Sequence, residues 1–316
     1  MTFTFIINPK AGRGRFHGSG NALERAARGA GLSCSFRYTN YRGHARHLAA
    51  EAAGRTDVVV AVGGDGTIHE VVSGLVEAGA SARRRISPTY LGIVPSGTGN
   101  DFAKMFDLPS RLAPLMQVLK EAKTARVDYG IVRWEGLDGR GTGVFVNVAG
   151  AGFDAKVASS AAGFKKLRGT SRYLAAVLST LRSWESPEVR VDLFHGGGEL
   201  ERVETSMLMV LVGNGRCAAG GFYLTPDATI VDGMLDVCIV GRISGWRIAS
   251  LIPRVLRGRS LRDEPEIVQR RVRSLEVRST VPLPVQADGE VLAERARFVH
   301  LDLVEKGLPI VMPLKS

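Results

Sequence analysis

Residues Val60 to Val72 read VAVGGDGTIHEVV and place three glycines and an aspartate between an apolar run and a segment with helical spacing. Because glycine has no Cβ, such a strand-to-helix turn leaves its backbone N–H groups uncovered. Those groups stand at the positive end of the dipole of the following helix. The stretch therefore indicates a phosphate-binding turn, and by itself it fits a tight connection in an α/β fold equally well.

Short β-branched runs alternate with helical patterns over the first 127 residues, which predicts a doubly wound α/β domain. Apolar spacing predicts helices over Leu23–Ala30 and His47–Ala53, and a third helix that follows the turn and ends at Gly79. Three apolar runs are expected to form buried parallel strands: Thr2–Ile7, Val58–Val62 and Leu91–Val94.

From Asp128 onward strand-like runs are separated by Gly-rich turns, which predicts an antiparallel, β-rich, sandwich-like domain over residues 128–305. A helical insert is expected from Thr170 to Trp184, preceded by the basic stretch FKKLRG at Phe164–Gly169. That stretch is read either as a solvated surface or as a contact with an acidic membrane. Four runs are expected to be strands: Gly143–Ala149, Val189–Phe194, Ser206–Val212 and Leu235–Val240.

The composition favours anionic partners, because 42 basic and 31 acidic residues give a net charge of +11. Aromatic residues are sparse and arginine is spread along the chain, so no nucleic-acid surface is indicated. The three cysteines form no CxxC pair, which fits a reducing, cytoplasmic setting. Neither a signal peptide nor a membrane-spanning run is evident, so we expect any membrane contact to be peripheral.

Three glycine-bearing turns follow the three predicted strands, and the carboxyl ends of strands in an open α/β sheet are where ligands gather. They are Asn8–Gly14, Gly63–Thr67 and Pro95–Asp101. None matches GxxxxGK[ST] or GxGxxG, which argues against Walker-type NTPases and ordinary Rossmann dehydrogenases. Thr98 and Asp101 also have capping-box spacing, so a structural role for both stays open.

Seven ordered motifs give the chain a resemblance to the diacylglycerol kinase catalytic-domain family, in particular to soluble bacterial lipid kinases related to sphingosine kinases. The resemblance covers nearly the whole chain, although GGDGT alone also resembles NAD kinases and phosphofructokinases. It implies a phosphofructokinase- or NAD kinase-like amino-terminal domain that residues 306–316 complete. The motifs are INPKAGRG, Thr39 with GHA, GGDGT, PSGTGNDFA, AGFDA, PDATIVDGMLDV and ADGE.

The resemblance implies two binding sites. ATP is expected against Asn8, Thr39, Gly63, Gly64, Asp65, Gly66, Thr67 and Thr98. A structural Mg²⁺ is expected to take the Asp232 carboxylate and backbone carbonyls near Thr229 and Met234, since this ion prefers hard oxygen ligands. From the local sequence alone, Asp232-Gly233 reads as a hairpin turn before a strand.

Two acidic residues are the candidate catalytic groups. Asp65 is expected to bind catalytic Mg²⁺ or to orient the acceptor hydroxyl, with a plain turn residue as the alternative. By family analogy Glu290 accepts the proton of the lipid hydroxyl, whereas a lone DGE would be an exposed turn. Two residues depart from the family pattern, His69 where asparagine is common and Ala11 where serine is frequent.

The resemblance therefore implies an ATP-dependent kinase that phosphorylates a diacylglycerol-like lipid at the membrane surface. A kinase of a sphingoid base, of another glycerolipid or of NAD is the alternative within enzymes. A catalytically silent nucleotide- or lipid-binding regulator is the alternative outside them. The sequence does not decide between a monomer and a homodimer.

Overall fold

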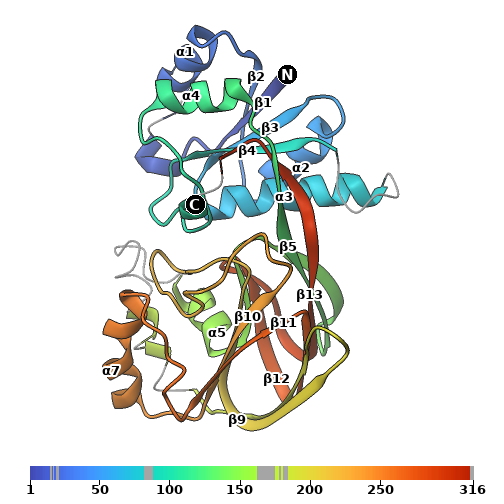
Figure 1. The fold of residues 1–316 in the computed structure, drawn as a ribbon, viewed down its shortest axis with the longest axis vertical. Coiled ribbons are helices and arrows are strands. Elements are labelled where there is room, and N and C mark those ends of the chain that lie inside the picture. The colour runs from blue at the N-terminus through green and yellow to red at the C-terminus, as the bar shows by residue number, and fades with distance from the viewer. Residues whose placement is uncertain are drawn as a thin grey trace. The chain divides into compact units, whose positions relative to one another are not determined.

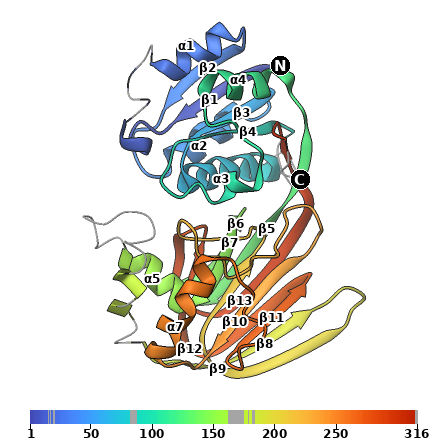
Figure 2. The ribbon, with the colours of Figure 1, turned by 60° about the vertical axis from the view of Figure 1, so that its left-hand side comes forward.

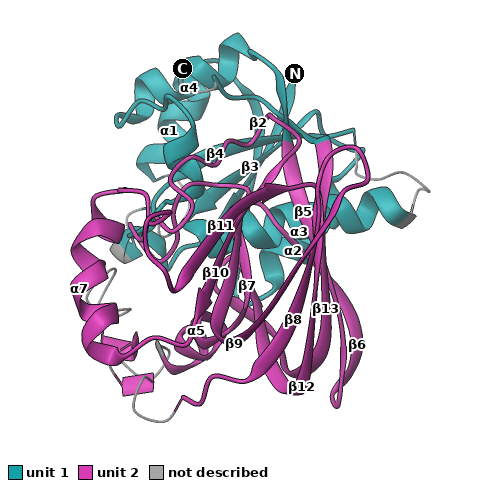
Figure 3. Cartoon of the chain, turned by 60° about the horizontal axis from the view of Figure 1, so that its bottom comes forward, with its two compact units in different colours: residues 1–127, 306–316 teal, residues 128–305 magenta. Residues whose placement is uncertain are grey.

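The computed structural model describes residues 1–14, 16, 18, 21–81, 88–161, 175–177, 179–180 and 184–313. It divides into two compact units, shown in Figure 3: unit 1 holds residues 1–127 and 306–316, and unit 2 holds residues 128–305. Two strands cross the boundary, β5 (Ala125–Gly136) and β13 (Glu290–Ile310). Among the described residues, no helix has the length and apolar character that crossing a bilayer requires.

Unit 1 is a doubly wound α/β domain, which confirms the predicted fold class (Figure 1). Its parallel strands are ordered β4 (Tyr90–Pro95), β3 (Val58–Gly63), β1 (Thr2–Ile7) and β2 (Ser33–Tyr38). Ile310 of β13 adds one pairing beside Leu91 of β4. The chain moves across the sheet from β1 to β2 in one direction and from β2 through β3 to β4 in the other. Right-handed crossovers therefore place the helix after β1 on one face and the helices after β2 and β3 on the opposite face.

The helices of unit 1 contact each other in two pairs. α1 (Ala22–Gly29) contacts α4 (Leu112–Glu121), and α2 (His44–Ala52) contacts α3 (Asp65–Ser81). Two short 3-10 helices lie in the loops, η1 (Ala11–Gly14) and η2 (Phe102–Met105). α3 continues two residues beyond Gly79, because this glycine keeps a helical backbone instead of the positive φ of a C-terminal cap.

The sequence pattern did not indicate β2 because this edge strand is only half covered. Its residues SCSFRY alternate between exposed and partly buried positions. By contrast, all six residues of β3 are buried, as expected for a central strand of a sheet covered on both faces.

Unit 2 is a β-sandwich in which two long strands each join both layers (Figure 2). β7 (Val148–Gly152) pairs with the second parts of β9 (Leu200–Gly213) and β12 (Ser274–Ala287), and β8 (Glu188–Phe194) pairs with their first parts. β12 changes register between Arg278 and Leu283, next to Pro282, which cannot donate to a ladder. The remaining strands are β6 (Gly139–Phe145), β10 (Leu235–Gly241) and β11 (Ile267–Val272).

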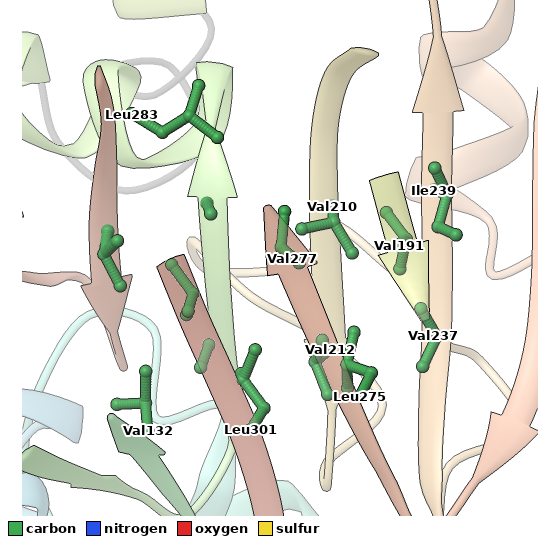
Figure 4. Packing of buried hydrophobic residues seen from close by; sticks show 14 of the residues in the cluster. Val132, Val191, Val210, Val212, Val237, Ile239, Leu275, Val277, Leu283 and Leu301 are labelled. Carbon is green, nitrogen blue, oxygen red and sulfur yellow. The ribbon is translucent and has the colours of Figure 1, made fainter. Parts of the chain in front are cut away.

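Alternate residues of these strands meet in one buried cluster, shown in Figure 4, which includes Val132, Val191, Val210, Val237 and Leu275. A second apolar cluster lies under α5 (Phe153–Ala161) and α7 (Gly245–Leu256) and contains Phe153, Leu211, Leu251 and Val255. The two clusters use neighbouring residues of the same strands, such as Val210 and Leu211 of β9. The helices therefore cover the outer face of the sandwich layer that β9 and β10 build.

The single strand expected over Gly143–Ala149 is wrong, because β6 and β7 are separated at Val146 and Asn147. Within the predicted insert Thr170–Trp184, the described residues 175–177 and 179–180 are helical. The basic stretch Phe164–Gly169 lies outside the described residues.

Candidate active site

The carboxyl ends of β1, β3 and β4 lie side by side in unit 1. Ile7 pairs with Val62, and Gly63 pairs with Pro95. Just beyond these ends, the Asn8 N–H donates to Val62 O at 2.9 Å and the Thr39 N–H donates to Ile7 O at 2.9 Å. The structure therefore brings Asn8, Thr39 and the GGDGT turn to one edge of the sheet.

The GGDGT and PSGTGN turns touch through their backbones. A Cβ added to Gly97 would lie 2.5 Å from the Cα of Gly64, and one added to Gly64 would lie 3.1 Å from the Cα of Gly97. Real Cβ atoms do not come as close as 2.5 Å, so position 97 accepts only glycine unless the backbone moves. The two turns consequently present one continuous main-chain surface without a side chain at its centre.

Side chains of the site hold these turns in place. The Asn8 side-chain amide donates to Thr67 Oγ1 at 3.2 Å, and the N–H groups of Thr67 and Ile68 both donate to Gly64 O. In the other turn Asn100 adopts a φ of 51°, and its Oδ1 accepts from the Gly97 N–H at 2.8 Å. α3 begins at Asp65, so the GGDGT turn lies at a helix N-terminus, where N–H groups lack helical partners.

Ser96 lies in the PSGTGN turn and is not among the site residues predicted from the sequence. Its N–H donates to Gly63 O at 2.8 Å, and its Oγ is buried without a hydrogen-bond partner among the described residues. A buried hydroxyl without a partner costs free energy, because water no longer solvates it. A ligand oxygen at this edge would satisfy the group. Thr98, which was assigned, is exposed.

Asp65 joins the two turns. Its Oδ1 accepts from the N–H of Phe102 at 3.1 Å, at the start of η2. Because η2 begins at Phe102, the spacing of Thr98 and Asp101 does not form a capping box. The Asp101 carboxylate, which is buried, instead pairs with Lys104 Nζ at 2.6 Å. Asp65 therefore has a positioning contact in addition to the metal or hydroxyl role predicted for it.

Glu70 has a structural role that its neighbourhood in the sequence hides. Its two carboxylate oxygens accept from the Gly43 N–H at 2.8 Å and the Ala45 N–H at 3.0 Å, at the start of α2. A carboxylate at this end of a helix satisfies N–H groups that lack helical partners. The GHA motif is thus tied to α3 through Glu70.

In unit 2, Glu290 is the first residue of β13 and follows a tight turn. Asp288 and Gly289 have φ values of 50° and 86°, which is the pattern of a two-residue hairpin turn. Asp288 accepts from three consecutive backbone N–H groups, those of Val146, Asn147 and Val148, at 2.9, 2.9 and 3.0 Å. The turn that carries Glu290 is therefore anchored to the break between β6 and β7, and Gly289 within it is exposed.

A buried carboxyl group supports the same turn from the other side. The Oε1 of Gln286 accepts from the Gly289 N–H at 2.8 Å, and its Nε2 donates to Asp154 Oδ2 at 2.9 Å. Asp154 Oδ1 is buried without a hydrogen-bond partner among the described residues. Burial raises the pKa of Asp154 to about 7, against a smaller opposing effect of the Gln286 hydrogen bond.

The residues predicted to hold structural Mg²⁺ lie just before β10. The Asp232 Oδ1 accepts from the Met234 N–H at 3.1 Å, its Oδ2 pairs with Arg271, and Thr229 is half-buried. Asp236 nearby has a buried Oδ2 without a hydrogen-bond partner, 3.7 Å from Arg271 Nε. Burial raises the pKa of Asp236 to about 6 despite Arg271, and the charges of Asp232 and Asp227 raise it further.

Carboxylates and main-chain carbonyls are hard oxygen donors, which a small divalent cation prefers. Within the described ranges no three His, Cys, Asp or Glu side chains form a metal-binding group, so main-chain carbonyls would have to complete the coordination. Arg271 supplies the positive charge that both carboxylates meet in the structure.

Comparison with known proteins follows the same division of the chain. Residues 2–132 match the family model described as "Diacylglycerol kinase catalytic domain", and residues 147–307 match the "YegS C-terminal NAD kinase beta sandwich-like domain". A protein of Xanthomonas campestris named "Probable lipid kinase YegS-like" is 35% identical over 294 residues, covering 90% of each chain. A diacylglycerol kinase of Bacillus subtilis is 31% identical over 288 residues, covering 90% of this chain and 88% of the relative.

Solved structures show the same fold. The crystal structure of a diacylglycerol kinase from Bacillus anthracis superposes with a TM-score of 0.66 at 21% identity and covers 98% of this chain and 96% of the other. This likeness supports the architecture of a glycine-turn α/β domain followed by a β-sandwich.

Proposed function

The chain belongs to the diacylglycerol kinase catalytic-domain family of lipid kinases, and we propose that it uses ATP to phosphorylate the hydroxyl of a diacylglycerol-like lipid. The observation that carries the proposal is the contact of Gly64 with Gly97 at the end of three parallel strands. A surface of main-chain N–H groups without side chains suits the closely spaced charges of nucleotide phosphates.

Unit 1 supplies the phosphate contacts in this proposal. The N–H groups at the start of α3 neutralise phosphate charge, and the Ser96 hydroxyl gains the partner that it lacks. Asn8 fixes Thr67, which keeps the start of α3 in register with the end of β1. Thr39, whose N–H holds it beside Ile7, and the exposed Thr98 are expected to contact the nucleotide at the margins.

Glu290 of unit 2 acts as the general base in this proposal. The lipid oxygen forms a bond to the γ-phosphorus as the bond to the β,γ-bridging oxygen breaks, ADP leaves, and the hydroxyl proton passes to the Glu290 carboxylate. Asp288 and Gln286 hold the turn that carries Glu290. Asp65 orients the PSGTGN turn through Phe102, and we expect it to bind catalytic Mg²⁺ or to orient the acceptor hydroxyl.

We expect Mg²⁺ in two places. When bound with ATP, Mg²⁺ neutralises negative charge on the phosphates. The second ion, at Asp232, would have a structural role, with the Thr229 and Met234 segments providing carbonyl oxygens.

A kinase assay with radiolabelled ATP tests the proposal. The protein is mixed with Mg²⁺ and, in separate reactions, with diacylglycerol, monoacylglycerol, phosphatidylglycerol and a sphingoid base in detergent micelles, or with NAD. Chloroform-soluble label that is greatest with diacylglycerol supports the proposal. Greater label in another lipid or in NADP would identify that alcohol as the substrate instead. ATP binding without any labelled product contradicts the proposed kinase activity and supports a catalytically silent regulator.

A further inference from the structure

The outer face of α7 in unit 2 is apolar although it meets solvent. Leu251 and Val255 face inward and are buried in the cluster beneath the helix. On the opposite face Trp246 is 85% exposed and Leu256 is 39% exposed. The positions between them on this face are also exposed and carry no charge: Ala249, Ser250 and Pro253. Their spacing of three and four residues places all five on one stripe of the helix.

The arginines around α7 fall into two groups. Arg247 and Arg254 lie at its sides and pair with the buried Glu264, which fastens the helix to the following loop. Arg242, Arg257 and Arg259 are exposed at the two ends of the apolar stripe, and among the described residues none of the three forms an ion pair. The second group therefore presents three uncompensated positive charges beyond the two ends of a stripe that carries an exposed tryptophan.

This combination fits the surface of an anionic bilayer. Tryptophan favours the boundary between headgroups and acyl chains, because its large ring is apolar and its N–H is polar. Arginines beside a helix lying in that plane meet headgroup phosphates, and each one strengthens binding to an anionic surface about fivefold. A protein partner that covered this stripe would need acidic groups to match all three arginines, whereas an anionic membrane supplies them everywhere.

We propose that the outer face of α7, with Trp246 near its amino-terminal end and with Arg242, Arg257 and Arg259 beyond its two ends, docks unit 2 on an anionic lipid bilayer. This inference deepens the proposed function, because docking brings the kinase to the surface where its lipid substrate resides. Binding to vesicles needs neither ATP nor an acceptor lipid. The failure of one proposal can therefore be distinguished from the failure of the other.

Co-sedimentation with sucrose-loaded vesicles tests the docking surface. The full chain is incubated without ATP with vesicles of phosphatidylcholine alone or with 30% phosphatidylglycerol, on the order of the anionic content that gives a strong surface potential. We expect binding to the anionic vesicles only, weakened by added salt, because screening shortens the reach of the arginines. Equal binding to both vesicle types, or binding to neither, overturns the proposal.

Matched variants locate the surface. We expect Trp246→Ala to weaken binding at least about tenfold, from the lost burial of its ring. The double variant Arg257→Gln/Arg259→Gln should weaken it about 25-fold, from two lost charges. The controls are Leu200→Ala, which removes a side chain that is 49% exposed on another part of unit 2, and Arg55→Gln, an exposed arginine of unit 1. Unchanged binding of the controls supports the proposal, and losses that equal those of the α7 variants contradict it.

Discussion

The phosphate-turn edge of unit 1 and the Asp288–Glu290 turn of unit 2 prepare chemistry by different means. In unit 1 the central feature is an absence of side chains, because Gly64 and Gly97 let two backbones touch. In unit 2 the turn that carries Glu290 is held by other side chains, through Asp288 on three N–H groups and through the pair of Gln286 and Asp154. The first region therefore has no space for a side chain where the two turns touch. The second region depends on the protonation of carboxyl groups and on the direction of their hydrogen bonds.

The largest effect that separates the two regions is expected at Glu290. Glu290→Gln keeps the shape of the side chain and removes its ability to accept a proton, so kcat should fall about 10²- to 10⁴-fold. The affinity for ATP should stay unchanged, because the residue belongs to unit 2 and the phosphate contacts are proposed in unit 1, and the denaturant midpoint shows whether the variant is folded. Kinase turnover, urea unfolding and ATP titration measure the three quantities.

Glu294→Gln is the control for this prediction. Glu294 lies on the same strand four residues further on and is exposed. It should retain full turnover. If Glu290→Gln also turns over at the normal rate, Glu290 is not the base, and the second region loses its proposed chemistry.

The two regions also differ in how well the sequence predicts them, because the first is built from local patterns and the second from long-range hydrogen bonds. The glycine turns, the strands before them and the helix after Gly64 are local patterns, so the doubly wound fold and the edge bearing Asn8 and Thr67 could be predicted. Even here the contact between Gly64 and Gly97 could not be predicted, because it joins two turns that are far apart in the sequence. The role of Glu70 could not be predicted, because its two N–H partners lie in a distant segment.

The support of Glu290 could not be predicted from spacing. Asp288 bonds to N–H groups about 140 residues earlier in the chain, and Asp154 meets Gln286 across 132 residues. β6 and β7 read as one strand, because the break at Val146 and Asn147 is satisfied by Asp288 and not by a local turn residue. Long-range hydrogen bonds of this kind leave no periodic trace.

Asp154 should give the next largest effect, which is a change of the free energy of unfolding with pH. Its pKa is about 7 in the folded chain because the carboxyl group is buried, against about 3.9 when unfolded. The folded protein therefore binds the extra proton, and the stability that this provides is full below about pH 4 and is lost as the pH rises towards 7. Between pH 5 and pH 8 the loss amounts to about 2–3 kcal/mol.

Urea unfolding of wild type and Asp154→Asn at pH 5, 6.5 and 8 measures this contribution. Relative to the variant, the wild type should lose stability across the series, since asparagine does not titrate. Asp138→Asn, on an exposed turn between β5 and β6, should run parallel to the wild type. A wild-type curve parallel to that of Asp154→Asn would show that the carboxyl group titrates as it does in the unfolded chain.

Gly97→Ala tests the steric requirement of unit 1 and should have a smaller effect. The new Cβ would lie 2.5 Å from Gly64 Cα and 2.9 Å from Asn100 Oδ1, so the turns must separate. Such overpacking costs about 1–3 kcal/mol, while replacing glycine lowers the entropy of the unfolded chain and returns about 0.4–1 kcal/mol. We expect a net loss of about 1–2 kcal/mol in urea unfolding and weaker ATP binding.

Gly29→Ala gives the opposite sign. Gly29 ends α1, its backbone has no positive φ, and an added Cβ would meet no atom within 4 Å. Alanine favours the helix, so this variant should gain up to about 1 kcal/mol and bind ATP as before. A Gly97→Ala protein that is as stable and as tight in ATP binding as Gly29→Ala would mean that the two turns do not need their backbone contact.

The smallest effect is expected at Ser96. Here unit 1 resembles unit 2, because nucleotide binding is proposed to use one side-chain hydrogen bond, that of the Ser96 hydroxyl. Without a ligand the buried Oγ has no partner, so Ser96→Ala should leave the free energy of unfolding unchanged or raise it slightly. With nucleotide bound the hydroxyl would be satisfied, and its loss should weaken ATP binding about 3- to 10-fold, the equivalent of about 0.5–1.5 kcal/mol. Calorimetric titration of ATP, with urea unfolding of the free protein, separates the two states. Destabilisation of the free protein without a change in ATP affinity would assign the hydroxyl to the fold and leave the phosphates to the main chain alone.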